Sequence, residues 1–128
     1  MKLLLDTHTF LWFVLNQPEL STTARDLIIN PNNDILLSPA SYWEIAIKIS
    51  IGKYQFPGPY ELWMNDQLLT NTIEILPITI AHTATVIKLP FHHKDPFDRL
   101  LIAQSIAENI SIISTDGIFD SYAVDRIW

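Results

Sequence analysis

Four acidic side chains in this chain have the type and spacing that metal-dependent hydrolysis requires. They are Asp6, Glu44, Asp98 and Asp116. Carboxylates that share a cleft repel one another unless a cation neutralises them, and the hard cations Mg²⁺ and Mn²⁺ prefer oxygen ligands. A metal held there would activate water and polarise a phosphoryl group. Together the four acids predict a site that hydrolyses phosphodiester bonds without a cysteine or serine nucleophile.

Each acid also has a purely structural explanation. Asp6 is suited to cap a helix, and Asp116 followed by Gly117 is typical of a turn. Glu44 can pair with Lys48 one helical turn later. No single position chooses between the two interpretations. The metal-site prediction therefore depends on whether the fold brings the four carboxylates together.

Short apolar runs alternate along the chain with segments of helical periodicity. The predicted strands are 2–5, 35–37, 73–76, 110–114 and 124–127, and the predicted helices are 9–15, 22–29, 40–51, 60–69, 79–87 and 96–109. This alternation is typical of right-handed βαβ units. We expect one α/β domain over residues 1–128, with a parallel central sheet of four to five strands flanked by helices.

The predicted elements place the acids at one edge of that sheet. Asp6 and Asp116 each follow a strand, while Glu44 and Asp98 fall in the first turns of helices that can begin at the same edge. Ligands of open α/β sheets bind in the crevice outside the carboxyl ends of the strands. We therefore expect the four carboxylates to converge in that crevice.

The helix predicted at 96–109 has the clearest start signal in the chain. Asp95 is an N-cap candidate, Pro96 takes the first helical position, and Asp98 adds negative charge to the first turn. An apolar band follows at helical spacing, comprising Leu100, Ile102, Ala103, Ile106 and Ala107. Asp98 should therefore lie at the edge of a buried face.

Composition limits the remaining possibilities. The chain is 48% hydrophobic and long enough for one sizeable core, and it has no cysteine, which excludes thiol catalysis and thiolate metal sites. The net charge of −6 is unlike that of a protein with a broad basic surface for nucleic acid. No apolar run is long enough to cross a membrane, so a cytoplasmic protein is expected.

Four stretches resemble, in order and spacing, the successive motifs of PIN-domain proteins, in particular the VapC-like toxins of bacterial toxin–antitoxin pairs. They are LLLDTH at 3–8, SYWEIAIK at 41–48, DPFDRLLIAQ at 95–104 and STD at 114–116. The stretch at 95–104 is the most specific. The resemblance implies a Mg²⁺-dependent ribonuclease whose metal-binding acids are Asp6, Glu44, Asp98 and Asp116, with Mn²⁺ as a possible substitute.

The same resemblance implies partners: an RNA substrate, a cognate antitoxin that covers the site, and a second copy of the chain in a homodimer. Lys48 and Arg99 lie near the expected crevice, where they are candidates to contact phosphate. The paired His92 and His93 are more typical of a solvated loop. An apolar groove between the helices of 9–29 and 60–69 is suited to an amphipathic partner helix.

Two other classes of protein with an aspartate after the first strand fit this sequence less well. A haloacid-dehalogenase-type phosphatase requires a second aspartate two residues after the first, where this chain has His8. A receiver domain requires an acid pair beside the first strand and a lysine after a late strand, and neither is found. The remaining alternative is a non-catalytic module of the same fold that binds RNA or a protein.

Overall fold

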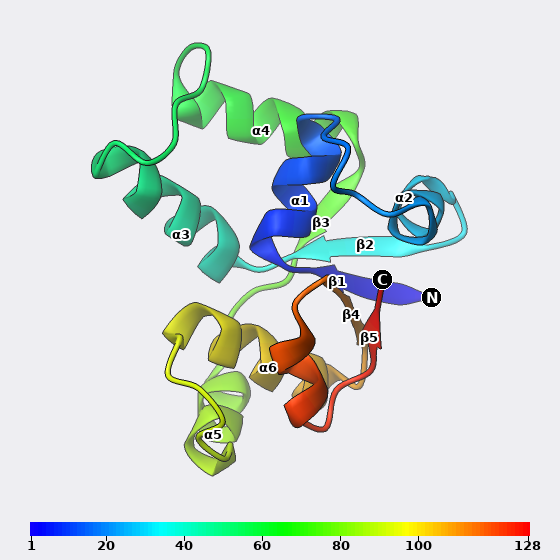
Figure 1. Cartoon of the computed structure of the whole chain (residues 1–128), viewed down its shortest axis with the longest axis vertical. Coiled ribbons are helices and arrows are strands. Elements are labelled where there is room, and N and C mark those ends of the chain that lie inside the picture. The colour runs from blue at the N-terminus through cyan, green and yellow to red at the C-terminus, as the bar shows by residue number, and fades with distance from the viewer.

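The computed structural model describes all residues 1–128, and its centre is a five-stranded, fully parallel sheet with the strand order β3-β2-β1-β4-β5 (Figure 1). The strands are β1 (Lys2–Leu5), β2 (Asp34–Leu37), β3 (Ile73–Ile75), β4 (Ser111–Ile113) and β5 (Arg126–Ile127). The helices are α1 (Thr7–Val14), α2 (Thr22–Ile29), α3 (Pro39–Ser50), α4 (Tyr60–Thr70), α5 (Ile80–Lys88) and α6 (Pro96–Glu108), with a 3-10 helix η1 (Gly117–Ser121). The predicted fold class is confirmed.

The first strand lies at the middle of the sheet, between strands from distant parts of the chain. Leu4 of β1 is in register with Leu36 of β2 on one side and with Ile112 of β4 on the other. The chain therefore runs outward from β1 in one direction first and returns to its other side later. Such a reversal of strand order opens a crevice at the carboxyl ends of the two strands that flank it.

Alternating residues of each strand face opposite layers of helices. Leu3 and Leu5 belong to the core under α1 to α4, whereas Leu4 belongs to the core under α6 and η1. Figure 1 shows these two layers, with α1, α2, α3 and α4 on one face of the sheet and α5 and α6 on the other. Both faces are apolar because a parallel sheet is covered on both sides. Each fully buried leucine contributes roughly 1.5–3 kcal/mol to stability.

Short polar side chains start the helices next to the site. The side chain of Ser38, which precedes Pro39, accepts a hydrogen bond from the amide of Ala40. The side chain of Asp95 accepts hydrogen bonds from the amides of Phe97 and Asp98. These contacts satisfy main-chain donors that have no partner inside the helix. They fix where α3 and α6 begin, and hence the positions of the acids these helices carry.

The structure differs from the sequence prediction in four places. Helix α1 begins at Thr7 because Asp6 caps it, and the last strand spans only Arg126–Ile127. The segment after Asp116 is a 3-10 helix rather than a simple turn. Helix α3 is less buried than its composition suggested, since Trp43 is 61% exposed.

Candidate metal centre

Asp6 is a buried carboxylate held from two sides. It follows β1 directly and is only 5% exposed. Its Oδ1 accepts a hydrogen bond from the Thr9 amide at 2.7 Å, which caps the start of α1. Its Oδ2 accepts a short hydrogen bond from the hydroxyl of Ser114. Burial raises the pKa of Asp6 above its ordinary value, although these hydrogen bonds oppose the shift. The structural and functional interpretations of Asp6 are therefore compatible.

Ser114 joins Asp6 to the end of the neighbouring strand. It follows β4, and its Oγ also accepts from the amide of Asp116 at 3.0 Å. Asp116 in turn accepts from the Ile118 amide at 3.0 Å and so caps η1. One hydroxyl thus fixes the spacing between two of the predicted site residues. Sequence reasoning quoted Ser114 as part of a motif but gave it no role.

Glu44 reaches the same region from α3, where it lies in the second turn rather than the first. Its side chain is 14% exposed, and its Oε2 is 4.0 Å from Nζ of Lys48. Thr7 donates to Ser41 at 3.1 Å and so ties the start of α1 to α3 beside the acids. The predicted pairing of Glu44 with Lys48 is present, but its length makes it a weak contact.

The pKa of Asp98 reflects its burial and the charges of the other acids. Burial is the main cause that raises its pKa to about 7, and the charges of Asp95, Asp6, Glu44 and Asp116 raise it further, in that order. These influences require the carboxylates to be near one another, because Coulomb interactions between separated groups are screened. The fold therefore places Asp6, Glu44 and Asp116 within electrostatic range of Asp98.

The donor chemistry of this cluster fits a hard divalent cation. All four groups offer carboxylate oxygens, and the charges of neighbouring acids add to the effect of burial in raising the pKa of Asp98. As the side chains stand, no group of three or more Asp, Glu or His is close enough together to hold a metal ion. Binding of a cation would therefore require the carboxylates to move closer together.

Comparison with known proteins identifies the family of this chain. The model of the PIN domain family matches residues 3–125. This chain belongs to the PIN-domain family. Ribonuclease VapC16 of Mycobacterium tuberculosis (strain ATCC 25618 / H37Rv) is 38% identical over 60 residues, a segment that spans 47% of this chain and 43% of that relative. The resemblance read from the four motifs is thereby confirmed.

Two solved structures share the fold of this PIN domain. VapBC2 from Rickettsia felis, bound to a DNA fragment from its promoter, has a TM-score of 0.74 at 17% identity and covers 99% of this chain and 98% of the other. VapBC-5 from Mycobacterium tuberculosis, a member of the VapBC family of toxin–antitoxin systems, has a TM-score of 0.62 at 15% identity and covers 98% of this chain and 97% of the other.

No helix of this PIN domain has both the length and the apolar character needed to cross a bilayer.

The predicted phosphate contact by Arg99 is wrong. Arg99 is only 5% exposed, and its guanidinium donates to the carbonyls of Leu89 and Pro90 and to the hydroxyl of Tyr122. The ring of Phe91 covers it, with the centroid 4.1 Å from Cζ. Its hydrogen bonds go to the loop before α6 and to Tyr122, so Arg99 holds that loop in place. Lys48, in contrast, keeps a partly exposed side chain beside Glu44.

Sequence reasoning also missed two further groups beside the acids of the PIN domain. His93 brings Nε2 to 3.6 Å from Oδ2 of Asp98, although its place in a loop suggested solvent exposure. Arg126 donates to the carbonyl of Ser114 at 3.0 Å and pairs with Asp120 at 2.8 Å. Neither has a local sequence signal, because both contacts join segments that only the fold brings together.

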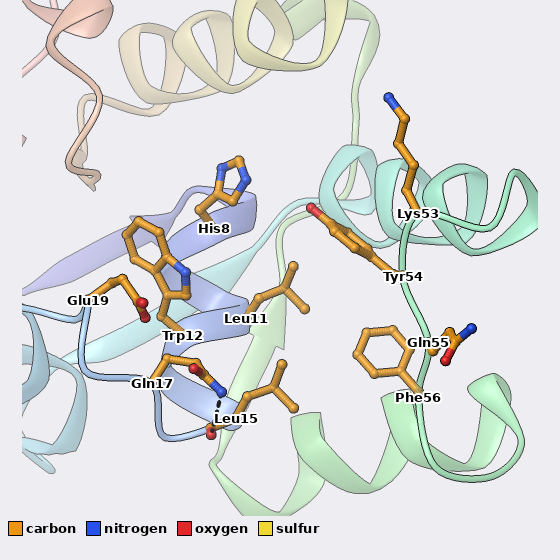
Figure 2. Close-up of a pocket in the computed structure, with 10 residues that line it drawn as sticks. All are labelled: His8, Leu11, Trp12, Leu15, Gln17, Glu19, Lys53, Tyr54, Gln55 and Phe56. Carbon is orange, nitrogen blue, oxygen red and sulfur yellow. Dashed lines mark hydrogen bonds between the residues drawn. The ribbon is translucent and has the colours of Figure 1, made fainter.

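A groove of about 390 Å³ opens beside α1 (Figure 2). His8, Leu11, Trp12 and Leu15 of and beside α1 form one wall, and the segment 53–56 with Tyr54 and Phe56 forms the other. No residue of α4 lines this groove, so it is not the groove expected between the helices of 9–29 and 60–69. Its second wall is the connection between α3 and α4. Lys53 lies at its rim in Figure 2.

Proposed function

We propose that this PIN domain is a Mg²⁺-dependent endoribonuclease and the toxin of a toxin–antitoxin pair. The observation that carries the proposal is the influence of the charges of Asp6, Glu44 and Asp116 on Asp98, which supports a shared crevice for the four carboxylates. The similarity to Ribonuclease VapC16 supports the choice of RNA. Because that similarity spans less than half of either chain, the activity is an inference about this protein.

Asp6, Glu44, Asp98 and Asp116 would hold the cation. When bound, Mg²⁺, or Mn²⁺ in its place, supplies charge neutralisation and Lewis-acid activation of water at a phosphodiester. Ser114 keeps Asp6 and Asp116 at a fixed separation, and the amides of Thr9 and Ile118 fix their rotamers. These hydrogen bonds limit the ordering that the two carboxylates would need in order to bind the cation.

Of the basic side chains near the acids, Lys48 would contact the RNA. Lys48 lies beside Glu44 and carries a mobile ammonium group suited to a phosphate oxygen. Arg126 is tied to Asp120 and to the carbonyl of Ser114, so it stabilises the site rather than the substrate. Since the net charge is −6, binding depends on these few local contacts and on the metal rather than on a broad basic surface.

The proposed partners use two different apolar surfaces. An antitoxin helix would fill the groove of Figure 2 and cover the crevice next to Asp6. A second copy of the chain would cover exposed apolar side chains, among which Trp43 and Phe91 are 61% and 78% exposed. Both assignments rest on exposed apolar area, which marks interaction sites on proteins.

The test is cleavage of a pool of structured RNA by the purified protein with Mg²⁺, with Mn²⁺ and with EDTA, beside the Asp98→Asn variant. Cleavage that needs both the metal and Asp98 supports the proposal. Cleavage in EDTA, or by Asp98→Asn at the wild-type rate, refutes it. Absence of both cleavage and calorimetric metal binding would favour a non-catalytic module that binds RNA or a protein.

A further inference from the structure

A buried polar chain leads from Arg99 to the carboxylate of Asp98. It starts in the loop before α6, where Arg99 fixes the carbonyls of Leu89 and Pro90 at 3.4 and 2.8 Å. The same guanidinium donates to the hydroxyl of Tyr122 at 3.3 Å. Arg99 has no acceptor atoms, so the direction of this first link is unambiguous. The hydroxyl of Tyr122 receives a hydrogen there.

The hydroxyl of Tyr122 is left with one way to use its own hydrogen. Tyr122 is 7% exposed, and its oxygen accepts from the main-chain amide of His93 at 3.3 Å as well as from Arg99. A phenolic oxygen that accepts twice still carries one O–H to donate. The ring nitrogen Nδ1 of His93 lies 2.8 Å away. Nδ1 must therefore accept, and the neutral imidazole carries its proton on Nε2.

The proton on Nε2 of His93 faces Asp98 in the proposed metal centre. Nε2 of His93 is buried and has no hydrogen-bond partner, and Oδ2 of Asp98 is 3.6 Å away. A buried donor without a partner costs about 1–3 kcal/mol, so a small movement of the Asp98 carboxylate towards Nε2 is favoured. The carboxylates of Asp6 and Asp116 already accept hydrogen bonds that hold them. His93 offers Asp98 the equivalent support.

We propose that His93, with its tautomer set by Tyr122 and Arg99, is a positioning residue that holds Asp98 for the cation through Nε2–H. The inference rests on the proposed metal-dependent function and adds to it the group that orients one ligand. Donors of this kind fix ligand orientation, and their loss typically lowers metal affinity about 10–100-fold. His93 itself touches neither cation nor substrate in this role.

The test measures binding of Mg²⁺ alone by calorimetry, with Mn²⁺ followed by electron paramagnetic resonance as a second probe. His93→Ala should bind either metal about 10–100-fold more weakly than the wild type. His93→Gln should recover most of that affinity, because its amide can accept from Tyr122 and donate to Asp98. His92→Ala is the matched control, since the His92 ring packs 4.9 Å from the same tyrosine ring without facing Asp98. It should bind like the wild type.

A second measurement needs no metal. Long-range proton–nitrogen correlation spectra should show the Nε2–H tautomer for His93 in the wild type and a loss of that preference in Tyr122→Phe. The Nδ1–H tautomer in the wild type would overturn the inference, as would undiminished metal affinity in a folded His93→Ala. A wild type that binds no divalent metal would refute the proposed function itself and, with it, the positioning role.

Discussion

Replacing Asp98 by asparagine should stabilise the metal-free protein at high pH. The pKa of this carboxyl is raised from 3.8 to about 7, first by burial and then by the charges of Asp95 and the other site acids. The folded state therefore prefers the protonated form, and ionisation costs stability as the pH rises from 3.8 towards 7. Above pH 7 the whole cost is present. Asparagine has a similar shape and lacks this charge.

The size of the effect follows from the shift. At about 1.4 kcal/mol per pKa unit, the shift corresponds to roughly 4 kcal/mol as an upper bound. The side chain of Asp98 is 24% exposed, and its charge also interacts favourably with the start of α6, so solvent screening and the helix dipole reduce the expected gain to about 1–2 kcal/mol. For a domain of this size that is a rise in melting temperature of about 3–8 °C.

The assay is thermal unfolding in EDTA at pH 8 and pH 5, for the wild type, Asp98→Asn and the control Asp26→Asn, which alters an exposed acid of α2. Asp98→Asn should be the more stable at pH 8, with less than half of that advantage at pH 5. Adding Mg²⁺ should raise the melting temperature of the wild type and leave Asp98→Asn nearly unchanged. An Asp98→Asn protein that is less stable than the wild type at pH 8, or equally shifted at both pH values, would refute the reasoning.

Three further substitutions test the site and its surroundings. Ser114→Ala removes the donor to Asp6 and the acceptor for the Asp116 amide, so stability should fall by about 1–3 kcal/mol and Mg²⁺ affinity should weaken; unchanged calorimetry and melting would contradict the bridging role. Arg99→Met should cost about 2–4 kcal/mol in denaturant unfolding without raising KM for RNA in the folded fraction, because its donors face main-chain carbonyls; a raised KM with full stability would restore the phosphate contact. Lys48→Ala should raise KM several-fold and change stability by less than about 0.5 kcal/mol, since its pair with Glu44 is long; a pure stability effect would exclude substrate contact.

Local pattern was sufficient for the parts of the protein that depend on neighbouring residues. Asp95 and Pro96 predicted the start of α6, and the structure has the predicted cap with hydrogen bonds at 2.9 and 3.1 Å. Asp6 and Asp116 could be assigned to one edge because the carboxyl ends of parallel strands meet there. The rule for helix starts holds for Asp98, in the first turn of α6, but not for Glu44, which lies in the second turn of α3. Capping and strand alternation are short-range properties, so a sequence states them directly.

Only the tertiary structure decided which side chains these acids and their neighbours meet. Arg99 follows Asp98 in the sequence and resembled a phosphate ligand, yet the loop folded across α6 gives it buried carbonyls as partners. His93 faces Asp98 because Tyr122, 29 residues further along, fixes its ring. Trp43 sits in an apolar helix but remains 61% exposed. Composition and periodicity specify that a residue can be buried or charged, whereas its partner depends on the strand order and loop path that bring distant segments together.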